Sequence, residues 1–215
     1  MTQPLLVLTW LLFVLLGGGV VGFVILGLRH RWRRRRLAMR CMAAGLEFVP
    51  NDPFNAPRYF CDFALMSAGH SPRAQNVSQG RAGGARLRAF DFGYEVGHGI
   101  RRSSRQYTVL VLEGEHGLKD VLMWHRDDAG GAPLQAAQAE SLIGPWVYGG
   151  DAETAARLAR ACEPLATVRA SLQVIRGVLM ICAPAMGGET YERLTAASTE
   201  VCETLGVRAA SGGAI

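Results

Sequence analysis

Cysteine and histidine are the residue types in this sequence best suited to metal binding or nucleophilic catalysis, and there are five of each. No two cysteines form a Cys-x-x-Cys pair, and no two histidines have the i, i+4 spacing of a helical metal site. Cys162, Cys182 and Cys202 recur every 20 residues, a spacing foreign to zinc sites, and lie among apolar residues typical of a core. The sequence therefore predicts free thiols, no bound metal and no cofactor.

The densest small group of titratable side chains surrounds His98, with Glu95 and Arg101 close by in the sequence. A strand is expected on either side, so we interpret this group as a solvated hairpin loop and not as an acid–base site. The glycine-rich stretch Gly80–Gly84 lacks the Lys-Ser/Thr ending of a phosphate-binding loop and precedes a strand instead of a helix. We expect a turn there, no catalytic residues, and no enzymatic activity.

Arginine is concentrated in one short segment, which holds Arg29, Arg31, Arg33, Arg34, Arg35, Arg36 and Arg40. The whole chain has a net charge of +5, so the rest of the chain, without these seven arginines, carries −2. A nucleic-acid-binding domain needs basic residues spread over a surface. We therefore expect no nucleic acid among the partners.

The segment before these arginines predicts a transmembrane helix. Leu5 to Leu28 is 24 residues long, almost wholly apolar, and free of charged side chains. At ~1.5 Å per residue it extends roughly 36 Å, which crosses a hydrocarbon core of about 30 Å with some tilt. A cleaved signal peptide is the competing interpretation, but Met1–Pro4 has no charged side chain, the apolar run is too long, and arginines stand where cleavage should occur.

The arginine-rich segment also predicts orientation, because positively charged flanks remain in the cytoplasm. We expect an N-terminus outside, a cytoplasmic C-terminal domain, and a place in the bacterial inner membrane; a single lysine with abundant alanine and glycine is typical of a GC-rich bacterial genome. Each arginine near anionic headgroups contributes about 1 kcal/mol. The residues expected at the lipid surface are Arg29, Arg31, Trp32, Arg33, Arg34, Arg35 and Arg36.

Glycines give the apolar helix a face that another helix can approach. Gly18 and Gly22 form a Gly-x-x-x-Gly pair, which allows close backbone contact between helices. We therefore expect Gly18 and Gly22 to mediate helix–helix contact, with other integral membrane proteins as partners beside membrane lipid.

The residues after the arginines predict one domain of mixed strands and helices. Residues 37–44 continue as a short helix that Gly45 ends, and residues 49–57 are expected to be loop. Apolar and β-branched runs predict strands at 58–66, 90–96, 107–112 and 121–124. A hairpin loop at 97–104 is expected to link the strand at 90–96 to the strand at 107–112. In the strand at 90–96, apolar residues alternate with Asp91, Gly93 and Glu95, which is typical of a half-buried strand.

Clear start and stop signals divide the last third of the chain. A short strand at 145–148 precedes Asp151, a good N-cap for a helix over 152–162. Arg176-Gly177 predicts a tight hairpin between strands at 172–175 and 178–181, and residues 189–205 form a last helix. The expected organisation is α+β: an anchor with its arginines at 1–36, a cytoplasmic domain at 37–206, and a flexible tail at 207–215.

Two stretches of this sequence carry a resemblance to known proteins. They are Trp146 to Ala155 (WVYGGDAETA), followed by the hairpin and closing helix, and Arg73 to Tyr94, which includes RAQNV and AFDFGY. This part resembles a family of uncharacterised bacterial membrane-anchored proteins with a basic segment after the span and a cytoplasmic α+β domain. The resemblance implies the same architecture, and no catalytic residue follows from it.

We expect a non-catalytic, membrane-anchored accessory or scaffold subunit that docks on a larger bacterial membrane protein complex. The glycine face, the near-neutral domain and the missing catalytic motifs favour this function. Two alternatives remain open. One is a membrane-surface sensor or lipid-binding domain, which requires an apolar pocket or a second basic face. The other is an enzyme whose site is assembled only by the fold, from a polar cleft and a titratable group with a shifted pKa.

Overall fold

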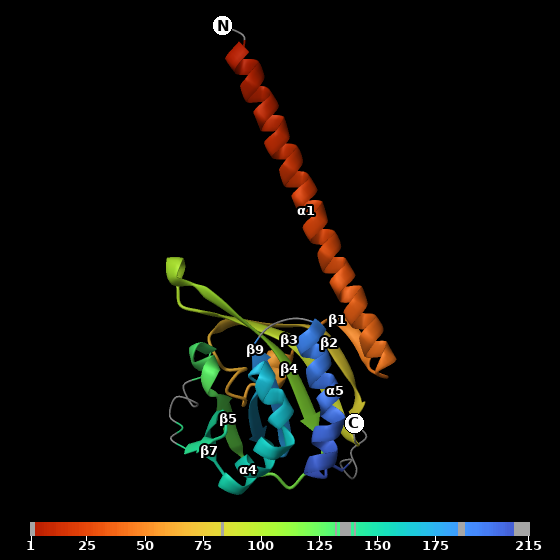
Figure 1. The fold of residues 1–215 in the computed structure, drawn as a ribbon, viewed down its shortest axis with the longest axis vertical. Coiled ribbons are helices and arrows are strands. Elements are labelled where there is room, and N and C mark those ends of the chain that lie inside the picture. Colours follow the sequence, from red (N-terminus) through yellow and green to blue (C-terminus); the bar gives the residue numbers. More distant parts are fainter. Residues whose placement is uncertain are drawn as a thin grey trace. The chain divides into compact units, whose positions relative to one another are not determined.

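The computed structural model describes residues 3–82, 84–131, 133, 139, 141–184 and 188–208. The chain divides into two compact units, Met1–Arg40 and Cys41–Ile215. Helix α1 (Gln3–Ala43) makes up the first unit and supplies the first residues of the second. The ribbon in Figure 1 follows α1 and then the strands and helices of the second unit.

Helix α1 is long and apolar enough to cross a membrane, and the same length and composition also fit a signal sequence. The prediction of one long apolar helix at the N-terminus is confirmed. The helix continues without interruption through the arginines and ends just before Gly45, whose φ of +71° is the left-handed conformation that terminates many helices.

The described residues of the second unit form one nine-stranded antiparallel sheet with the strand order β1-β2-β3-β4-β9-β8-β5-β7-β6. The predicted α+β class is therefore confirmed. The strands are β1 (Glu47–Asn51), β2 (His70–Ala82), β3 (Ala85–Val96), β4 (Ser103–Glu113), β5 (Val121–His125), β6 (Ser141–Ile143), β7 (Trp146–Gly150), β8 (Ser171–Ile175) and β9 (Val178–Pro184).

Tight hairpins fix the register of neighbouring strands. Arg176 and Gly177, with φ of +48° and +76°, join β8 to β9 as the two central residues of the turn that the sequence predicts. The longest ladder joins β3 to β4, where Arg86 pairs with Glu113 at one end and Val96 with Ser103 at the other.

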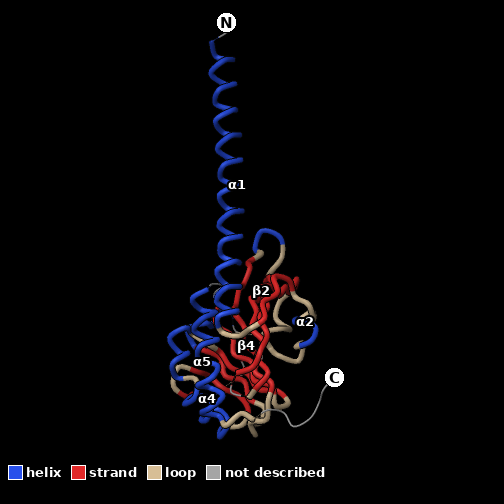
Figure 2. The backbone as a smooth tube through the Cα atoms, turned by 90° about the vertical axis from the view of Figure 1, so that its right-hand side faces the viewer, coloured by secondary structure: helices blue, strands red, loops and turns tan. Residues whose placement is uncertain are grey.

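Helices cover both faces of the sheet. Helices α4 (Ala152–Ala161) and α5 (Gly188–Leu205) lie together on one face, and the short α2 (Ala56–Tyr59) lies on the other, as Figures 1 and 2 show. Asp151 begins α4 as predicted, because its carboxylate accepts a hydrogen bond of 2.9 Å from the Thr154 N–H. Short 3-10 turns, η1 (Gly99–Arg101), η2 (Arg126–Gly131) and η3 (Glu163–Val168), complete the connections.

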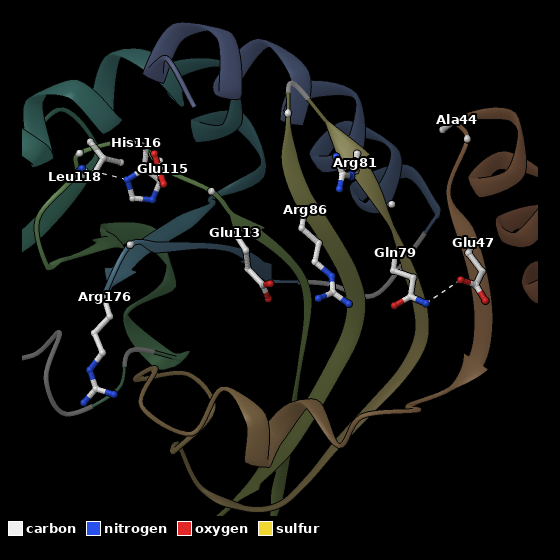
Figure 3. Close-up of a pocket in the computed structure, with 16 residues that line it drawn as sticks. Ala44, Glu47, Gln79, Arg81, Arg86, Glu113, Glu115, His116, Leu118 and Arg176 are labelled. Atoms are coloured by element: carbon white, nitrogen blue, oxygen red, sulfur yellow. Dashed lines mark hydrogen bonds between the residues drawn. The ribbon is translucent and has the colours of Figure 1, made fainter. Parts of the chain in front are cut away.

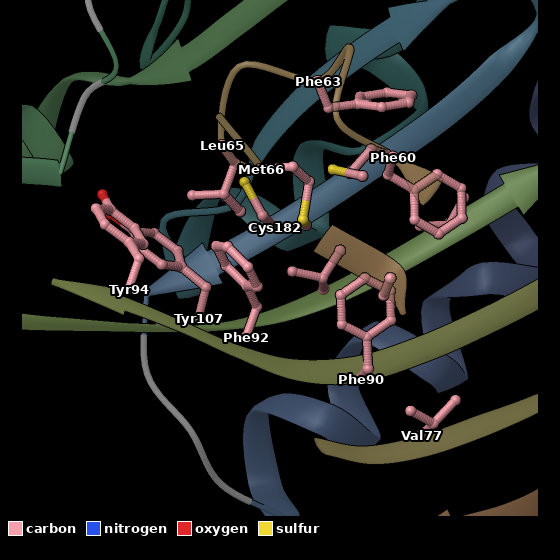
Figure 4. Close-up of a cluster of buried hydrophobic side chains, with 14 of the residues drawn as sticks. Phe60, Phe63, Leu65, Met66, Val77, Phe90, Phe92, Tyr94, Tyr107 and Cys182 are labelled. Carbon is pink, nitrogen blue, oxygen red and sulfur yellow. The ribbon is translucent and has the colours of Figure 1, made fainter. Parts of the chain in front are cut away.

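The α2 side of the sheet holds an aromatic core (Figure 4). Phe60 lies over Phe90 with the two rings stacked at 6.2 Å, and Tyr94 stacks on Tyr107 at 6.1 Å. Cys182 of β9 belongs to this cluster, and Cys162 and Cys202 are also buried, so the predicted core position of these three cysteines is confirmed. All five cysteines are free thiols.

Several local expectations are wrong. Residues 49–57 begin as strand β1 and not as loop, since Pro50 is tolerated in an edge strand. Residues 58–66 form α2 and turns, because their aromatic side chains pack on a sheet face instead of pairing with a strand. Strand β3 is buried on both faces, since α5 covers the face that carries Asp91.

Candidate functional site

A large cleft of the second unit lies at the end of the sheet where the β2–β3, β4–β5 and β8–β9 connections meet (Figure 3). It has a volume of about 1220 Å³. Most of the residues that line it are glycines or carry a charge. The lining residues are Ala44, Gly45, Glu47, Gln79, Gly80, Arg81, Gly84, Arg86, Glu113, Gly114, Glu115, His116, Gly117, Leu118, Arg176 and Gly177. The lining is therefore a mixture of polar and apolar surface and is rich in glycine.

Arg81 and Arg86 form the basic part of the cleft. They are direct cross-strand partners on β2 and β3, so both side chains extend from the same face of the sheet. Both are exposed, and neither has an ion pair within the described ranges of the chain. Like charges directly opposite each other destabilise a sheet. An anionic ligand would relieve that repulsion.

Two of the acidic residues in the cleft already have partners. Glu113 accepts a hydrogen bond of 2.6 Å from Arg88 Nη1, and Glu47 accepts one of 2.8 Å from Gln79 Nε2. The side chain of Arg88 is only 6% exposed and lies over the rings of Phe54, Tyr59 and Phe60. The partner of Glu47 is an uncharged amide, and Glu113 is also the cross-strand partner of Arg86, so the cleft carries charges of both signs.

His116 belongs to the wall of the cleft. Its Nδ1 accepts a hydrogen bond of 3.1 Å from the Leu118 N–H, which places the ring proton on Nε2. Burial lowers the pKa of His116, and the nearby Gly177 backbone offsets this in part. Nε2 has no hydrogen bond of good geometry to any described residue. Arg157 of α4 donates to the His116 carbonyl at 3.4 Å, so the ring stands on a loop fastened to the helical layer.

Arg176 forms the opposite wall. Its Nη1 lies 3.1 Å from Asp62 Oδ2, and its backbone N–H donates to Asp120 Oδ1 at 2.9 Å. Both members of the Arg176–Asp62 pair are well exposed, so solvent weakens the attraction. A ligand in the cleft can therefore compete with Asp62 for this guanidinium.

Guanidinium groups without partners bind carboxylates and phosphates through paired hydrogen bonds. The described lining contains no serine, threonine, cysteine, tyrosine, aspartate or lysine side chain. The chemistry that the cleft offers is recognition of an anionic group by guanidinium side chains.

Two other polar clusters lie inside the fold. Asn76 Nδ2 and Thr108 Oγ1 donate to the buried carboxylate of Asp91 at 2.9 and 3.3 Å, under α5. On the other face, Tyr107 Oη donates to Asp128 Oδ2 at 2.9 Å. Burial raises the pKa of Asp128, and the Tyr107 hydrogen bond acts in the opposite direction. Both clusters join separate elements, which is a structural role.

The residues predicted to contact partners lie on α1. A Cβ added at Gly18 or at Gly22 would meet no atom within 4 Å, so this face of α1 is uncovered. Arg29, Arg31, Trp32, Arg34, Arg35 and Arg36 are all exposed, and the side chain of Arg33 lies outside the described residues. At about 3.6 residues per turn, the arginines are distributed around the whole helix and not along one side.

The sequence did not predict this cleft. Residues 80–84 are expected as a turn, but residues 80–82 belong to strand β2, which pairs with β3 as far as Ala82 and Ala85. The symmetric placement of Arg81 and Arg86 about that turn was the available signal, since residues flanking a hairpin turn become cross-strand neighbours. No local pattern indicates that the His116 and Arg176 loops meet the same cleft. The group at His98 is indeed an exposed hairpin loop, and the Glu95 ion pair is made by Arg102 and not by Arg101.

Comparison with protein-family models, with curated proteins and with solved structures found no match for this chain. The expected family resemblance is therefore not supported by any match, and the architecture rests on the structure: an N-terminal long apolar helix followed by an α+β domain whose described residues form a nine-stranded antiparallel sheet.

Proposed function

We propose that this chain is a non-catalytic, membrane-anchored accessory subunit of a larger bacterial membrane protein complex, and that its cleft docks an acidic segment of a partner protein. The observation that carries this proposal is the Arg81–Arg86 pair, two like charges without ion partners facing an open cleft. Glutamate or aspartate side chains of a partner would supply the missing negative charge.

The size of the cleft favours a polypeptide over a small molecule. Its volume of about 1220 Å³ exceeds the roughly 300–1,000 Å³ of most small-molecule sites, and its lining mixes polar with apolar surface where such sites are mostly apolar. Exposed backbone at Gly45, Gly117 and Gly177 leaves room for an extended chain, because a Cβ at any of these positions would meet nothing within 4 Å.

The anchor is supported by the distribution of arginines around α1. A helix lying on a membrane surface carries its basic residues on one side. A helix that leaves a bilayer is surrounded by headgroups, so basic residues on all sides suit it. The unbroken course of α1 through these arginines supports a retained span over a cleaved signal peptide, with the domain in the cytoplasm.

The test is co-purification of the full-length protein from its native membrane in mild detergent. We compare wild type with the double variant Arg81→Glu, Arg86→Glu, and with Arg160→Glu, which reverses an exposed arginine of α4 outside the cleft. Each charged hydrogen bond contributes about 1.5–3 kcal/mol, so the cleft variant should retain less than roughly a tenth of the partner. Arg160→Glu should retain all of it.

Charge exchange then identifies the contact. Arginine introduced at the acidic segment of the recovered partner should restore binding to the Arg81→Glu, Arg86→Glu variant and weaken binding to wild type. Equal partner recovery by wild type and the cleft variant would refute the proposal. Loss of co-purifying anionic phospholipid, with protein partners retained, would favour the alternative of a lipid-binding sensor.

A further inference from the structure

The β3–β4 hairpin ends at the opposite end of the sheet from the cleft, and its tip protrudes. Strand β3 pairs with β2 only as far as Glu95, and β4 pairs with β9 only as far as Tyr107. Beyond these points β3 and β4 pair with each other and with no other described strand. Figure 1 shows the tip, with its single helical turn η1, extending past the other strands.

An apolar side chain stands at this tip. Ile100 is fully exposed, with a relative exposure of 104%, and Val96 at the base of the loop is 44% exposed. Gly97 has a φ of +79° and leaves space for the Arg101 carbonyl oxygen, which would lie 2.6 Å from a Cβ at that position. The loop is therefore curled back on itself with Ile100 outermost.

Basic residues surround Ile100. From Val96 to Leu112 the chain contains Arg101, Arg102 and Arg105 and no acidic residue. Arg102 forms an ion pair with Glu95, and exposed Arg101 has none within the part of the chain that the structure describes. At the base, His70 and His98 pack edge to face with ring centroids 5.0 Å apart, and His70 Nδ1 lies 2.7 Å from the Glu95 carbonyl oxygen. The His70 contacts thus hold the base of the hairpin loop in place, and the exposed charge of Arg101 lies at its tip.

We propose that this tip is a second membrane contact, in which Ile100 enters the interfacial region of an anionic lipid bilayer and Arg101 binds lipid phosphate. An exposed aliphatic side chain beside an unpaired positive charge suits an anionic lipid bilayer, which has charged headgroups at its surface and apolar chains beneath them. A protein interface needs a broad complementary area with a buried centre. A single convex side chain offers no such area, whereas fluid lipid adapts its shape to it.

This inference rests on the anchor proposed above. A chain tethered to a membrane by α1 keeps its other surfaces near lipid at high effective concentration, so weak lipid contacts at the tip are sufficient.

The test uses the full-length protein in nanodiscs with one copy per disc. In a Cys61→Ser background, Ser103→Cys carries an environment-sensitive fluorophore beside an intact Ile100, and the four remaining cysteines are buried. The same label at Arg160→Cys on α4 is the matched control. Nitroxide-labelled phosphatidylcholine is the quencher, in discs with and without phosphatidylglycerol.

Lipid quenching at position 103 in phosphatidylglycerol discs, with none at position 160, is the expected result. Ile100→Asp should lower the equilibrium constant for contact about tenfold, the effect of leaving one aliphatic side chain in water. Arg101→Glu should abolish the dependence on phosphatidylglycerol. Near-ultraviolet circular dichroism identical to that of wild type confirms that each variant is folded.

Absence of lipid quenching at position 103 in discs with phosphatidylglycerol would overturn the inference. Quenching that is equal in both lipids and unchanged by Arg101→Glu would overturn the assigned role of the phosphate. A fluorescence change that requires two copies per disc, without quenching by lipid, would assign the tip to contact between copies and would equally refute it. None of these outcomes depends on a protein in the cleft.

Discussion

Arg88 Nη1 lies 2.6 Å from Glu113 Oε1, with side-chain exposures of 6% and 21%, and this is the most buried ion pair among the described residues. The guanidinium also lies 4.9 Å from the ring centroid of Phe54 and 5.0 Å from that of Tyr59. Strands β3 and β4 and the α2 segment are thereby joined directly beneath the cleft. The pair holds the floor on which Arg81 and Arg86 stand.

Removing one partner of this pair should destabilise the fold. Glu113→Ala leaves a buried guanidinium without its carboxylate, and breaking such a pair costs about 3–5 kcal/mol. Denaturant unfolding of the full-length protein in detergent measures the free energy of unfolding. The control is Glu189→Ala, which breaks the exposed Glu189–Arg193 pair of α5 and should change that free energy by less than about 0.5 kcal/mol. Equal losses in the two variants would show that Arg88 is compensated by its aromatic neighbours.

The second unit should fold without the apolar helix. It has a continuous sheet covered on both faces and an aromatic core of its own. A fragment of residues 37–208 should be soluble and should unfold in one cooperative thermal transition by circular dichroism. A broad transition, or aggregation at low temperature, would mean that the fold needs a bound partner.

Stability should fall as the solution becomes acidic, in part because of His116. Burial lowers the pKa of His116 in the folded state, so the unfolded chain takes up a proton first as the pH falls below about 6.5. The stabilisation is therefore complete above that pH and is lost as the pH falls toward the lower folded pKa. His116→Asn preserves an acceptor for the Leu118 N–H and should make this acid-side loss shallower.

The measurement is the melting temperature of wild type and His116→Asn between pH 7.5 and pH 5, where ~6.5 is the ordinary histidine pKa. A residual slope is expected in the variant, because burial also lowers the pKa of His125. Parallel curves for the two proteins would contradict the assignment to His116.

The glycine face of α1 should contribute to partner binding independently of the cleft. Gly18→Leu with Gly22→Leu fills the uncovered face while keeping the helix apolar, so membrane insertion should be unchanged. Association should weaken by on the order of 1–2 kcal/mol, roughly five- to thirtyfold in affinity. Gly27→Leu, on another side of the helix, is the control. Identical partner recovery from the three proteins would mean that α1 is a simple tether.

Cysteine reactivity should report which side of the membrane the domain occupies. Cys61 is the exposed one of the five cysteines. Burial raises the pKa of Cys162 to about 12 and that of Cys202 to about 11, so these thiols stay protonated and unreactive. In intact spheroplasts a permeant maleimide should label Cys61, and an impermeant one should not. Labelling by the impermeant reagent would place the domain outside the cytoplasm.

Local signals in the sequence account for the elements that it predicted correctly. The uninterrupted apolar run specifies α1, the carboxylate of Asp151 begins α4, and the Arg176-Gly177 turn joins β8 to β9. Each of these depends on residues within a few positions of one another. The alternation in β3 predicted the strand but not its burial, because burial of Asp91 depends on α5, about 100 residues later.

The cleft depends on distant parts of the chain and was therefore not predictable. Glu113 and Arg176 meet only because β4 pairs with β9, although four other strands lie between these two in the sequence. No pattern in a single sequence specifies that strand order. The Arg81–Arg86 pairing was the exception, since it needs only the position of one hairpin turn.

The sheet has two edges, β1 and β6, and both are poor templates for another strand. Pro50 removes one backbone donor from β1, and β6 is only three residues long. Molecules tethered in a membrane diffuse in two dimensions and collide with copies of themselves often. In a chain anchored as proposed, edges limited by a proline and by a three-residue strand should keep colliding copies from pairing laterally into fibres.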